Sequence, residues 1–443
     1  MKKGALFLWS SALLIAVVMV FVSSGSVFAS GFALIEQSMS GLGNAYSGGA
    51  AGAEDASTIF YNPAGMTRLS GQELIVGTHI VMPSVKFHNE GSTHVSGLPL
   101  SGGNGGDGGV SKPVPNLYYT RKVTDKFSVG MGINAPFGLA TDYDKNWVGR
   151  YHAVESDVLT VNINPSIAYK ITDSLSFGAG FNVQYIKAKL SNAIDFGTIG
   201  YSLHIPGLLP QANDGFAELE GDSWGIGYDL GLLYEFTKNT RAGISYRSRI
   251  EHTLDGDVDF SKVPTPLKGT FKDGGIEADL TTPDSLSVSL YHQFSQEWAV
   301  MADFTWTNWS LFKKLDVEFD NPAMKDSVTT EKWQDTYRYS VGATYMPTKA
   351  WTFRVGTAYD TSAVESKKYR TPRIPDGDRI WAAAGAGYKV SDMVSFDIGY
   401  AHLFINDPEI SKTATGEDQL KGSLRGHFDA AIDIVSAQVT LRF

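Results

Sequence analysis

From residue 71 onward, apolar and polar residues alternate with the two-residue period of a β-strand. In one such segment Phe181 and Val183 fall on one face, while Asn182 and Gln184 fall on the other. A soluble sandwich would bury the apolar face, whereas a membrane barrel would turn it to lipid and line a wet lumen with the polar face. The pattern therefore predicts an all-β protein and leaves its surroundings open.

The connections between these segments distinguish the two kinds of fold. Six connections are short and alike, and seven are long. The short ones are 123–126, 171–174, 236–239, 294–297, 346–349 and 390–392, and the long ones lie near 83–114, 136–156, 190–217, 258–275, 312–334, 361–377 and 405–425. Short turns that alternate strictly with long loops are typical of an outer-membrane barrel, with the turns facing the periplasm. Residues 72–443 are therefore expected to form a membrane-spanning antiparallel β-barrel of about 14 strands.

Residues 30–71 show no sustained alternation and are rich in Gly, Ala and Ser. A barrel of this size is too wide for its own wall side chains to fill. We therefore expect the segment 30–71 to plug the lumen as an N-terminal hatch.

The first 29 residues have the three parts of a secretory signal peptide. A basic start at Lys2 and Lys3 precedes an apolar run from Ala5 to Val22, and the segment ends in the small-residue site Val27-Phe28-Ala29. The alternative is a membrane anchor, because the apolar run is long enough to span a bilayer. The cleavage-like tripeptide favours a signal peptide over residues 1–29, and no later apolar run is long enough for a spanning helix.

The composition narrows the function. A net charge of −10 argues against a nucleic-acid partner, and the absence of cysteine excludes a disulfide framework. The 20 Tyr, 24 Phe and 9 Trp suit the aromatic girdles of a barrel. The last strand ends at Phe443, and outer-membrane proteins resemble one another in such an aromatic ending, which the barrel assembly machinery reads.

Several motifs together resemble one family. Gly31-Phe32-Ala33-Leu34, the segment 40–48, Asp55-Ala56 and Asn62-Pro63-Ala64 are similar to the N-terminal hatch of the FadL family. Asn134-Ala135-Pro136-Phe137-Gly138-Leu139-Ala140-Thr141 looks like the kinked third strand of that family, and 245–248, 352–356 and 374–379 also match. Members are outer-membrane transporters of long-chain fatty acids, with relatives that take up toluene-like hydrocarbons.

The resemblance implies a set of gating residues. Phe32, Asn62, Pro63 and Ala64 would belong to the hatch, and Pro136, Phe137 and Gly138 would form an inward kink that lets ligand leave sideways into lipid. From the residues alone, Asn62-Pro63 also reads as a simple turn. Pro136 and Gly138 also read as the plain end of a strand.

Ligand capture is assigned to one external loop. Its apolar residues Leu203, Ile205, Leu208 and Leu209 would form an outer groove, although a loop that packs on itself is the alternative. Arg247, Arg338 and Arg354 lie in the lumen-facing phase and are candidates for contact with a carboxylate, or else are paired with Asp and Glu. Family members that bind fatty acids carry cations where Asn192 and Asp316 stand here, so a neutral hydrocarbon stays open as the ligand.

Catalytic, cofactor and metal sites are not expected. The segment 103–108 matches G-x-G-x-x-G, but it lies in a glycine-rich loop without the strand and helix that a nucleotide site needs. No nucleophile elbow or zinc-binding histidine pattern occurs. We therefore expect passive uptake of hydrophobic molecules, foremost long-chain fatty acids, and alternatively of aromatic or aliphatic hydrocarbons. A barrel lipid hydrolase and a structural barrel without cargo are the remaining alternatives.

The expected location is the bacterial outer membrane. The expected partners are a fatty acid or another hydrophobic ligand, outer-membrane lipid with lipopolysaccharide, and the assembly machinery. We expect a monomer that binds no nucleic acid.

Overall fold

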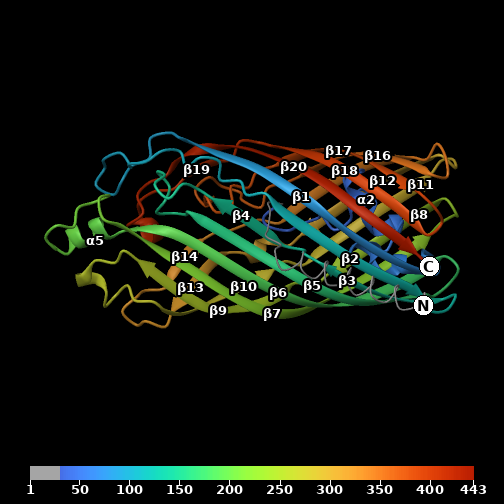
Figure 1. Ribbon diagram of the computed structural model, residues 1–443, viewed down its shortest axis with the longest axis horizontal. Coiled ribbons are helices and arrows are strands. Elements are labelled where there is room, and N and C mark those ends of the chain that lie inside the picture. The colour runs from blue at the N-terminus through green and yellow to red at the C-terminus, as the bar shows by residue number, and fades with distance from the viewer. Residues whose placement is uncertain (1–29) are drawn as a thin grey trace, which may run out of the picture.

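The computed structural model describes residues 30–443, and the predicted signal peptide lies outside the described residues. All strand segments belong to one antiparallel sheet that closes on itself (Figure 1). Strand β1 (Gln72–Asn89) pairs with β2 (Lys112–Lys122) on one side and with β20 (Arg425–Arg442) on the other. Because the first and last strands meet, the sheet has no free edge.

The barrel has 14 strands, which confirms the prediction. Eight of them are continuous: β1, β2, β5 (Glu155–Lys170), β6 (Leu175–Asp195), β7 (Asp214–Glu235), β16 (Trp351–Asp360), β17 (Arg379–Lys389) and β20. The other six are each made of two segments: β3 (Phe127–Asn134) with β4 (Gly138–Asp142), β8 (Thr240–Arg247) with β9 (Ile250–Ser261), β10 (Gly274–Thr282) with β11 (Ser285–Gln293), β12 (Trp298–Thr307) with β13 (Lys314–Phe319), β14 (Ser327–Thr330) with β15 (Thr336–Tyr345), and β18 (Val394–Ile405) with β19 (Glu409–Ser411).

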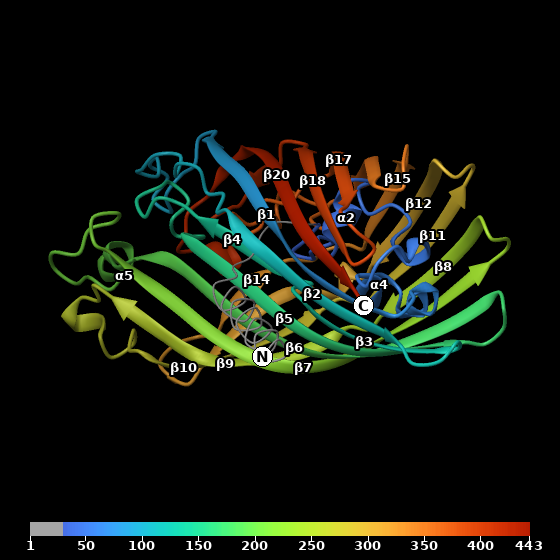
Figure 2. The ribbon, with the colours of Figure 1, turned by 45° about the vertical axis from the view of Figure 1, so that its right-hand side comes forward.

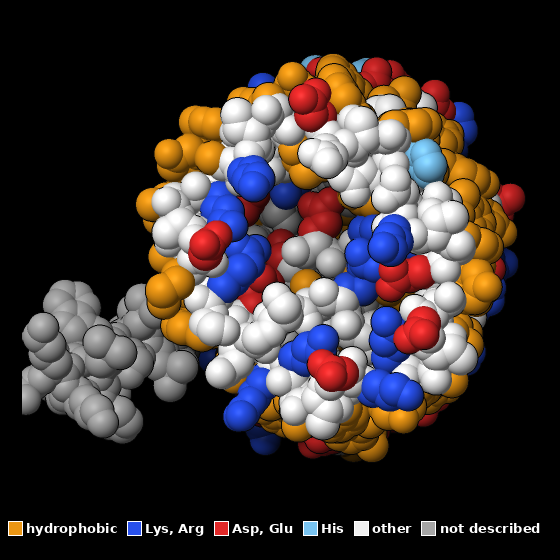
Figure 3. Space-filling model, turned by 90° about the vertical axis from the view of Figure 1, so that its right-hand side faces the viewer, with side chains coloured by type: hydrophobic (Ala, Val, Ile, Leu, Met, Phe, Trp, Pro, Cys, Tyr) orange, Lys and Arg blue, Asp and Glu red, His pale blue; other side chains and the backbone are white. Residues whose placement is uncertain are grey.

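The two faces of the wall have the orientation of a membrane barrel. Phe181 is 48% exposed on the outside, whereas its neighbour Asn182 is 1% exposed on the inside. Figure 3, which faces the end with the short turns, shows hydrophobic atoms around the outer rim and charged side chains around a central hollow. Apolar residues outside and polar residues inside suit a wall surrounded by lipid.

The six short turns share one hydrogen-bonding device. In each turn, a Ser or Thr hydroxyl oxygen accepts a hydrogen bond from the backbone N–H two residues further on. In five of the six turns it also accepts from the N–H three residues further on, as Thr172 accepts from Ser174 and Leu175. The acceptors are Thr124, Thr172, Thr237, Ser295, Thr348 and Ser391. A hydroxyl at this place holds the turn without a tertiary partner, which explains why the six turns look alike in the sequence.

The long connections all lie at the opposite end, as predicted, but the predicted boundaries are wrong in several places. Strand β1 continues to Asn89 and β6 to Asp195, well past the predicted loop starts. The strands continue beyond the apolar belt, where outward residues such as Ser84, Lys86 and His88 of β1 are polar and resemble a loop in the sequence. The loops also hold α5 (Phe196–Ser202), η2 (Thr265–Leu267) and η4 (Gly416–Asp418), whereas η3 (Trp309–Leu311) lies between the two segments of the strand β12–β13. No helix within residues 30–443 has the length and apolar character needed to cross a bilayer.

Residues 30–71, here called the interior segment, lie inside the barrel (Figures 1 and 2). The segment contains α2 (Met39–Leu42), α3 (Gly49–Gly52), α4 (Thr58–Tyr61) and η1 (Pro63–Arg68). Helix α2 contacts β17, β18 and β20, α3 contacts β8 and β11, and η1 contacts β5 and β6. The segment therefore contacts strands on several sides of the wall.

Wall glycines allow this close fit. A Cβ placed on Gly356 would lie 2.2 Å from the carbonyl carbon of Asn44, and one on Gly243 would lie 1.8 Å from the carbonyl oxygen of Ala50. On β6, a Cβ at Gly178 would lie 2.2 Å from the amide nitrogen of Ala64. The backbone of the interior segment therefore rests directly on the backbone of the wall, which only glycine permits.

Candidate functional site: a covered break in the barrel wall

The third barrel strand is interrupted by a bulge. Asn134 at the end of β3 pairs with Asn162, and Gly138 at the start of β4 pairs with Leu159. Four steps along one strand thus match three along the other, so β3–β4 has one extra residue. The oxygen of the Thr160 hydroxyl accepts from the backbone N–H of Phe137 at 3.0 Å, and the same hydroxyl donates to the Phe137 carbonyl at 2.7 Å.

The bulge leaves a gap in the ladder between the second and third strands. Strands β2 and β3 pair only as far as Leu117 with Ile133, and contact resumes at the isolated pair Gly109 and Thr141. Between these points β4 pairs with β5, and residues 110–116 have no strand partner on this side within residues 30–443. The backbone ladder of the wall is therefore interrupted between β2 and the kink.

The interior segment covers this gap from the lumen. The backbone N–H of Leu34 donates to the Pro136 carbonyl at 2.8 Å, and that of Gly138 donates to the Phe32 carbonyl at 2.8 Å. The Gln37 side-chain amide donates to the Ala135 carbonyl at 2.7 Å. The first residues of the interior segment thus act as a short extra strand against the kink.

Two cavities meet near Phe32: Phe32 lines the first, and the next residues, Ala33 and Leu34, line the second. The Phe32 ring centroid lies 4.6 Å from that of Trp309 and about 6 Å from those of its other aromatic neighbours, Phe137, Phe312 and Trp333. On the loop side lies an apolar cavity of about 90 Å³, which Phe32 itself lines together with Leu139, Val158, Leu254, Leu280 and Phe312. On the other side lies a second cavity of about 120 Å³.

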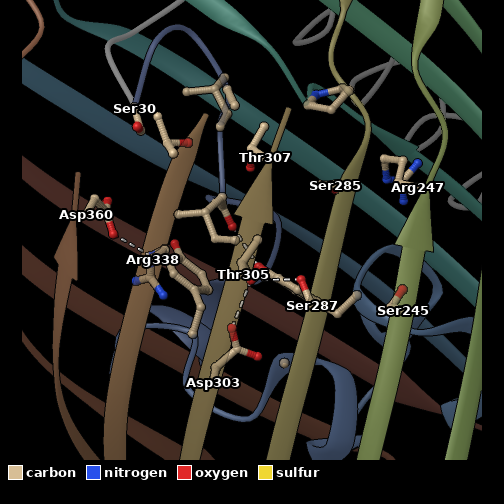
Figure 4. Close-up of a pocket in the computed structure, with 18 of the residues that line it drawn as sticks. Ser30, Ser245, Arg247, Ser285, Ser287, Asp303, Thr305, Thr307, Arg338 and Asp360 are labelled. Carbon is tan, nitrogen blue, oxygen red and sulfur yellow. Dashed lines mark hydrogen bonds and ion pairs between the residues drawn. The ribbon is translucent and has the colours of Figure 1, made fainter. Parts of the chain in front are cut away.

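The second cavity, here called the lumen cavity, is lined by polar wall residues and by the kink (Figure 4). Neighbouring strands contribute Ser245, Ser287, Asp303 and Thr305, and the kink contributes Pro136 and Phe137. Figure 4 shows Asp303 and Thr305 one above the other on the same strand, with Ser287 reaching toward Thr305. The arrangement offers an apolar cavity near the loops, aromatic side chains around Phe32, and a second cavity of mixed polar and apolar lining that touches the kink.

Residues 20–443 match the family described as outer membrane protein transport protein (OMPP1/FadL/TodX). The chain belongs to this family. It is therefore an outer-membrane protein of a transport family and not an enzyme.

The chain is 33% identical over 429 residues to a long-chain fatty acid transport protein of Escherichia coli O6:H1, which covers 91% of this chain and 92% of that protein. Its fold is similar to the crystal structure of a Pseudomonas aeruginosa FadL homologue, with a TM-score of 0.85, 25% identity, and coverage of 93% of this chain and 100% of the other. The Pseudomonas putida toluene transporter TodX has the same fold, with a TM-score of 0.64, 20% identity, and coverage of 88% and 94%.

The three arginines proposed from their lumen-facing phase all hold the interior segment. Arg247 donates to the Phe60 carbonyl at 3.0 Å, and Arg338 donates to the Ala45 carbonyl at 2.8 Å. Arg354 forms an ion pair with Glu54 at 3.3 Å. Each also faces a wall carboxylate: Asp229 at 3.7 Å, Asp360 at 3.1 Å and Asp397 at 2.9 Å, respectively. Their contact with a ligand carboxylate stays a prediction, although Arg247 and Arg338 do line the lumen cavity.

Asn62-Pro63-Ala64 combines the two roles considered for it. The Asn62 side chain accepts from the backbone N–H of Ala64 at 3.0 Å and so caps η1. The same side chain donates to the carbonyl of Leu232 on β7 at 2.9 Å. One residue thus makes the turn and fastens it to the wall.

Leu203, Ile205, Leu208 and Leu209 follow or lie just beyond α5, at the far tip of the loops. Leu203 is 59% exposed and Leu209 58% exposed, while Leu208 packs against Gly200. None of the four lines either of the two cavities described above. Their role in capturing ligand stays a prediction.

Arg373 is a cation at the site that the sequence did not reveal. Its side chain lines the apolar cavity, and it donates to Asn192 Oδ1 at 3.4 Å and to Ser156 Oγ at 3.0 Å. By resemblance to the FadL family, Asn192 stands where members that bind fatty acids carry a cation. Arg373 thus brings a positive charge to this place from a loop distant in the sequence, and only the structure brings the two together.

Glu331 shares the apolar cavity with Arg373. Burial raises the pKa of the Glu331 carboxyl to about 7, and burial lowers the pKa of the Arg373 guanidinium to about 10. Within residues 30–443 no carboxylate forms an ion pair with Arg373, and Glu331 accepts a hydrogen bond from the Trp333 indole at 3.0 Å instead. The cavity therefore combines an apolar wall with a guanidinium that has no ion-pair partner within residues 30–443, although the Glu331 carboxyl in the same cavity interacts with it electrostatically.

Proposed function

We propose that this chain carries long-chain fatty acids passively across the outer membrane. One observation carries the choice of ligand: the Arg373 guanidinium faces an apolar cavity beside Asn192 without an ion-pair partner in residues 30–443. A long apolar tail suits such a wall, since burial of apolar surface is worth roughly 25 cal/mol per Å². A carboxylate head suits an arginine, which binds it through paired N–H donors.

Relatives support the same ligand class. The similar protein of Escherichia coli O6:H1 is named a long-chain fatty acid transport protein. Uptake of a neutral hydrocarbon is the second candidate, because the apolar cavity is lined by little besides aliphatic and aromatic side chains. The similar fold of the toluene transporter TodX fits that reading too.

The proposed route begins at the loops and ends in the wall. Leu203, Ile205, Leu208 and Leu209 would capture ligand, and the apolar cavity would hold it above Phe32. A shift of the interior segment would then open a partition at Phe32 and uncover the gap beside Pro136, Phe137 and Gly138. The tail would pass sideways into lipid and so avoid water, which would cost about 0.8 kcal/mol per methylene.

The interior segment has the features of a movable hatch. Residues 30–71 form only short helices, and Ala45, Tyr46 and Ala53 have positive φ angles of 49°, 55° and 45°. Left-handed backbone at such residues costs about 1 kcal/mol or more each and persists only where the surroundings enforce it. Strain of this kind supports a segment that rearranges when ligand binds, with Asn62, Pro63 and Ala64 as its fixed end on the wall.

The proposed environment follows from the seam of the barrel. Phe443 exchanges backbone hydrogen bonds with Gln72 at 2.9 and 3.2 Å, so the C-terminal residue completes the closure. We propose that the assembly machinery recognises this strand, that lipopolysaccharide surrounds the loop end, and that the barrel works as a monomer.

Binding of radiolabelled oleate to the purified protein in detergent tests the proposal. Replacement Arg373→Met should weaken oleate binding about tenfold, which corresponds to the loss of one charge-assisted hydrogen bond. Binding of a neutral alkane of equal length should not change. Arg249→Met is the matched control, since Arg249 is partly exposed and lines neither cavity. Equal affinity of wild type and Arg373→Met for oleate would contradict the fatty-acid proposal and favour the hydrocarbon.

A further inference from the structure

Residues 112–116 of β2 form an edge that has no strand partner among the described residues on the side of the kink, and their sequence suits an unpaired edge. Residues Lys112, Val114 and Asn116 alternate with Pro113 and Pro115, and all five pair with β1. Because proline has no N–H, the residues that donate to β1 are the even-numbered ones. The two prolines therefore direct their backbone toward the gap, where no orphaned N–H is left.

Lys112 stands at the loop end of this edge. Leu117 pairs with Ile133 and Gly109 with Thr141, so the register between the second and third strands is the same below and above the gap. In that register Lys112 is the position opposite Gly138. An unbroken ladder would join these two residues, and the break separates them.

The side chain of Lys112 crosses the gap. Its ammonium lies 2.7 Å from the Asp157 carboxylate on β5, the strand beyond β4. Asp157 alternates with the buried residues Ser156 and Val158, so it belongs to the outward phase of β5. Lys112 shares the inward phase of β2 with the buried residues Val114 and Asn116, so its side chain passes through the gap to the outward Asp157. The ion pair thus ties β2 to β5 across the kink, while Phe32 and Leu34 cover the kink from the lumen.

The ion pair lies at the upper border of the apolar belt. Along the outward phase of β5, Asp157 and Glu155 follow Leu159 and Val161 toward the loops. Neighbouring outward cations have partners of their own: Lys187 pairs with Glu220 at 2.6 Å, and Lys189 pairs with Glu155 at 3.1 Å and Glu218 at 3.3 Å. Within residues 30–443, Asp157 is the one carboxylate paired with Lys112.

We propose that Lys112 is an exit-side binding site for the carboxylate of the transported ligand, which displaces Asp157 as the tail slides through the gap into the outer leaflet. The exchange replaces one carboxylate by another, so Lys112 stays paired throughout. Asp157 lies at the border of the membrane, where water can take over its solvation, and the ligand head never crosses the apolar belt unpaired. This inference rests on the proposed uptake of fatty acids and adds the place at which the head group leaves the barrel.

The two partners of the ion pair should have opposite effects on uptake. In cells that express equal amounts of folded barrel, Lys112→Met should slow oleate uptake about two- to five-fold, the range expected for one partly exposed ion pair. Asp157→Asn should leave oleate uptake equal or faster, because it frees Lys112 for the ligand. Neither replacement should alter uptake of a neutral alkane of equal length.

A purely structural ion pair would behave differently, because removing either partner would then affect uptake in the same direction and for both ligands. That result would overturn the exit site, and so would unchanged oleate uptake by Lys112→Met. Lys187→Met is the matched control, since it removes another outward ion pair away from the gap, and Lys112→Arg should retain the preference for oleate. Failure of the wild type to take up oleate would refute the proposed function itself. Heat-modifiable migration on gels reports folding of every variant.

Discussion

The backbone N–H of Gly138 donates a 2.8 Å hydrogen bond to the carbonyl oxygen of Phe32, which joins the wall of the barrel to the start of its interior segment. This one bond links the two elements on which the proposed route depends. While it holds, Phe32 lies where the two cavities meet and the gap beside β4 is covered from within. In the proposed route this bond breaks, and the cavities then communicate with the gap.

Truncation of Phe32 should change the preferred length of the ligand. Phe32→Ala removes the ring that, in the proposed route, separates the apolar cavity from the lumen cavity, so a longer tail fits. Each further methylene accommodated should add about 0.8 kcal/mol of binding free energy. Binding of saturated fatty acids of increasing length to the purified protein measures this, and an unchanged length profile would contradict a partition at Phe32.

Fatty-acid binding should weaken as the pH rises through 7. The pKa of Glu331 is raised to about 7 by burial, so this carboxyl is neutral below that pH and charged above it. When charged, it repels a ligand carboxylate in the same cavity and competes for Arg373. Affinity for oleate should fall about tenfold for each pKa unit of coupling between the two carboxyl groups.

The variant Glu331→Gln provides the control for this pH dependence. It stays neutral at every pH, so oleate affinity measured between pH 6 and pH 8.5 should be constant and similar to the wild-type value at low pH. A variant that keeps the wild-type profile would show that another group causes it.

A side chain at Gly356 should dislodge the interior segment without breaking the wall. Its Cβ would lie 2.2 Å from the backbone of Asn44, and β16 itself favours a β-branched residue. Gly356→Val should therefore raise single-channel conductance in planar bilayers while the barrel stays heat-modifiable. Gly269→Val is the control, because a Cβ there meets no atom within 4 Å. Equal conductance of both variants would argue against a plug seated on wall glycines.

The wall of the barrel could be predicted from the sequence because its rules are local. Alternation assigns each residue to lipid or lumen, and Thr172 and its five counterparts form turns through bonds within three residues. Strand ends were less predictable. Residues 190–195 and 214–217 fall in the predicted loop 190–217, but they pair with each other or with neighbouring residues on the regular strands β6 and β7.

The site depended on contacts that no local pattern contains. Arg373 reaches Asn192 across 181 positions of sequence, and Arg338 reaches the Ala45 carbonyl across 293. The lumen-facing phase of Arg338 was evident from alternation, but its partners were not, because any lumen position can face the interior segment. The role of Lys112 could not be predicted for the same reason. Its partner Asp157 lies on β5, and the two residues come together only because the ladder between β2 and the third strand is interrupted at the kink.

A reversible lock between Ala33 and Phe137 tests the central claim most directly. These residues form an antiparallel bridge, and the spacing of such pairs suits a disulfide. The chain contains no cysteine, so Ala33→Cys with Phe137→Cys introduces the one possible bond. Each single replacement serves as a control for the loss of the native side chain. The account predicts that the oxidised double variant still binds oleate at the cell surface but does not deliver it, and that reduction restores uptake. Delivery at the same rate in the oxidised and reduced states would contradict release through the gap beside Gly138.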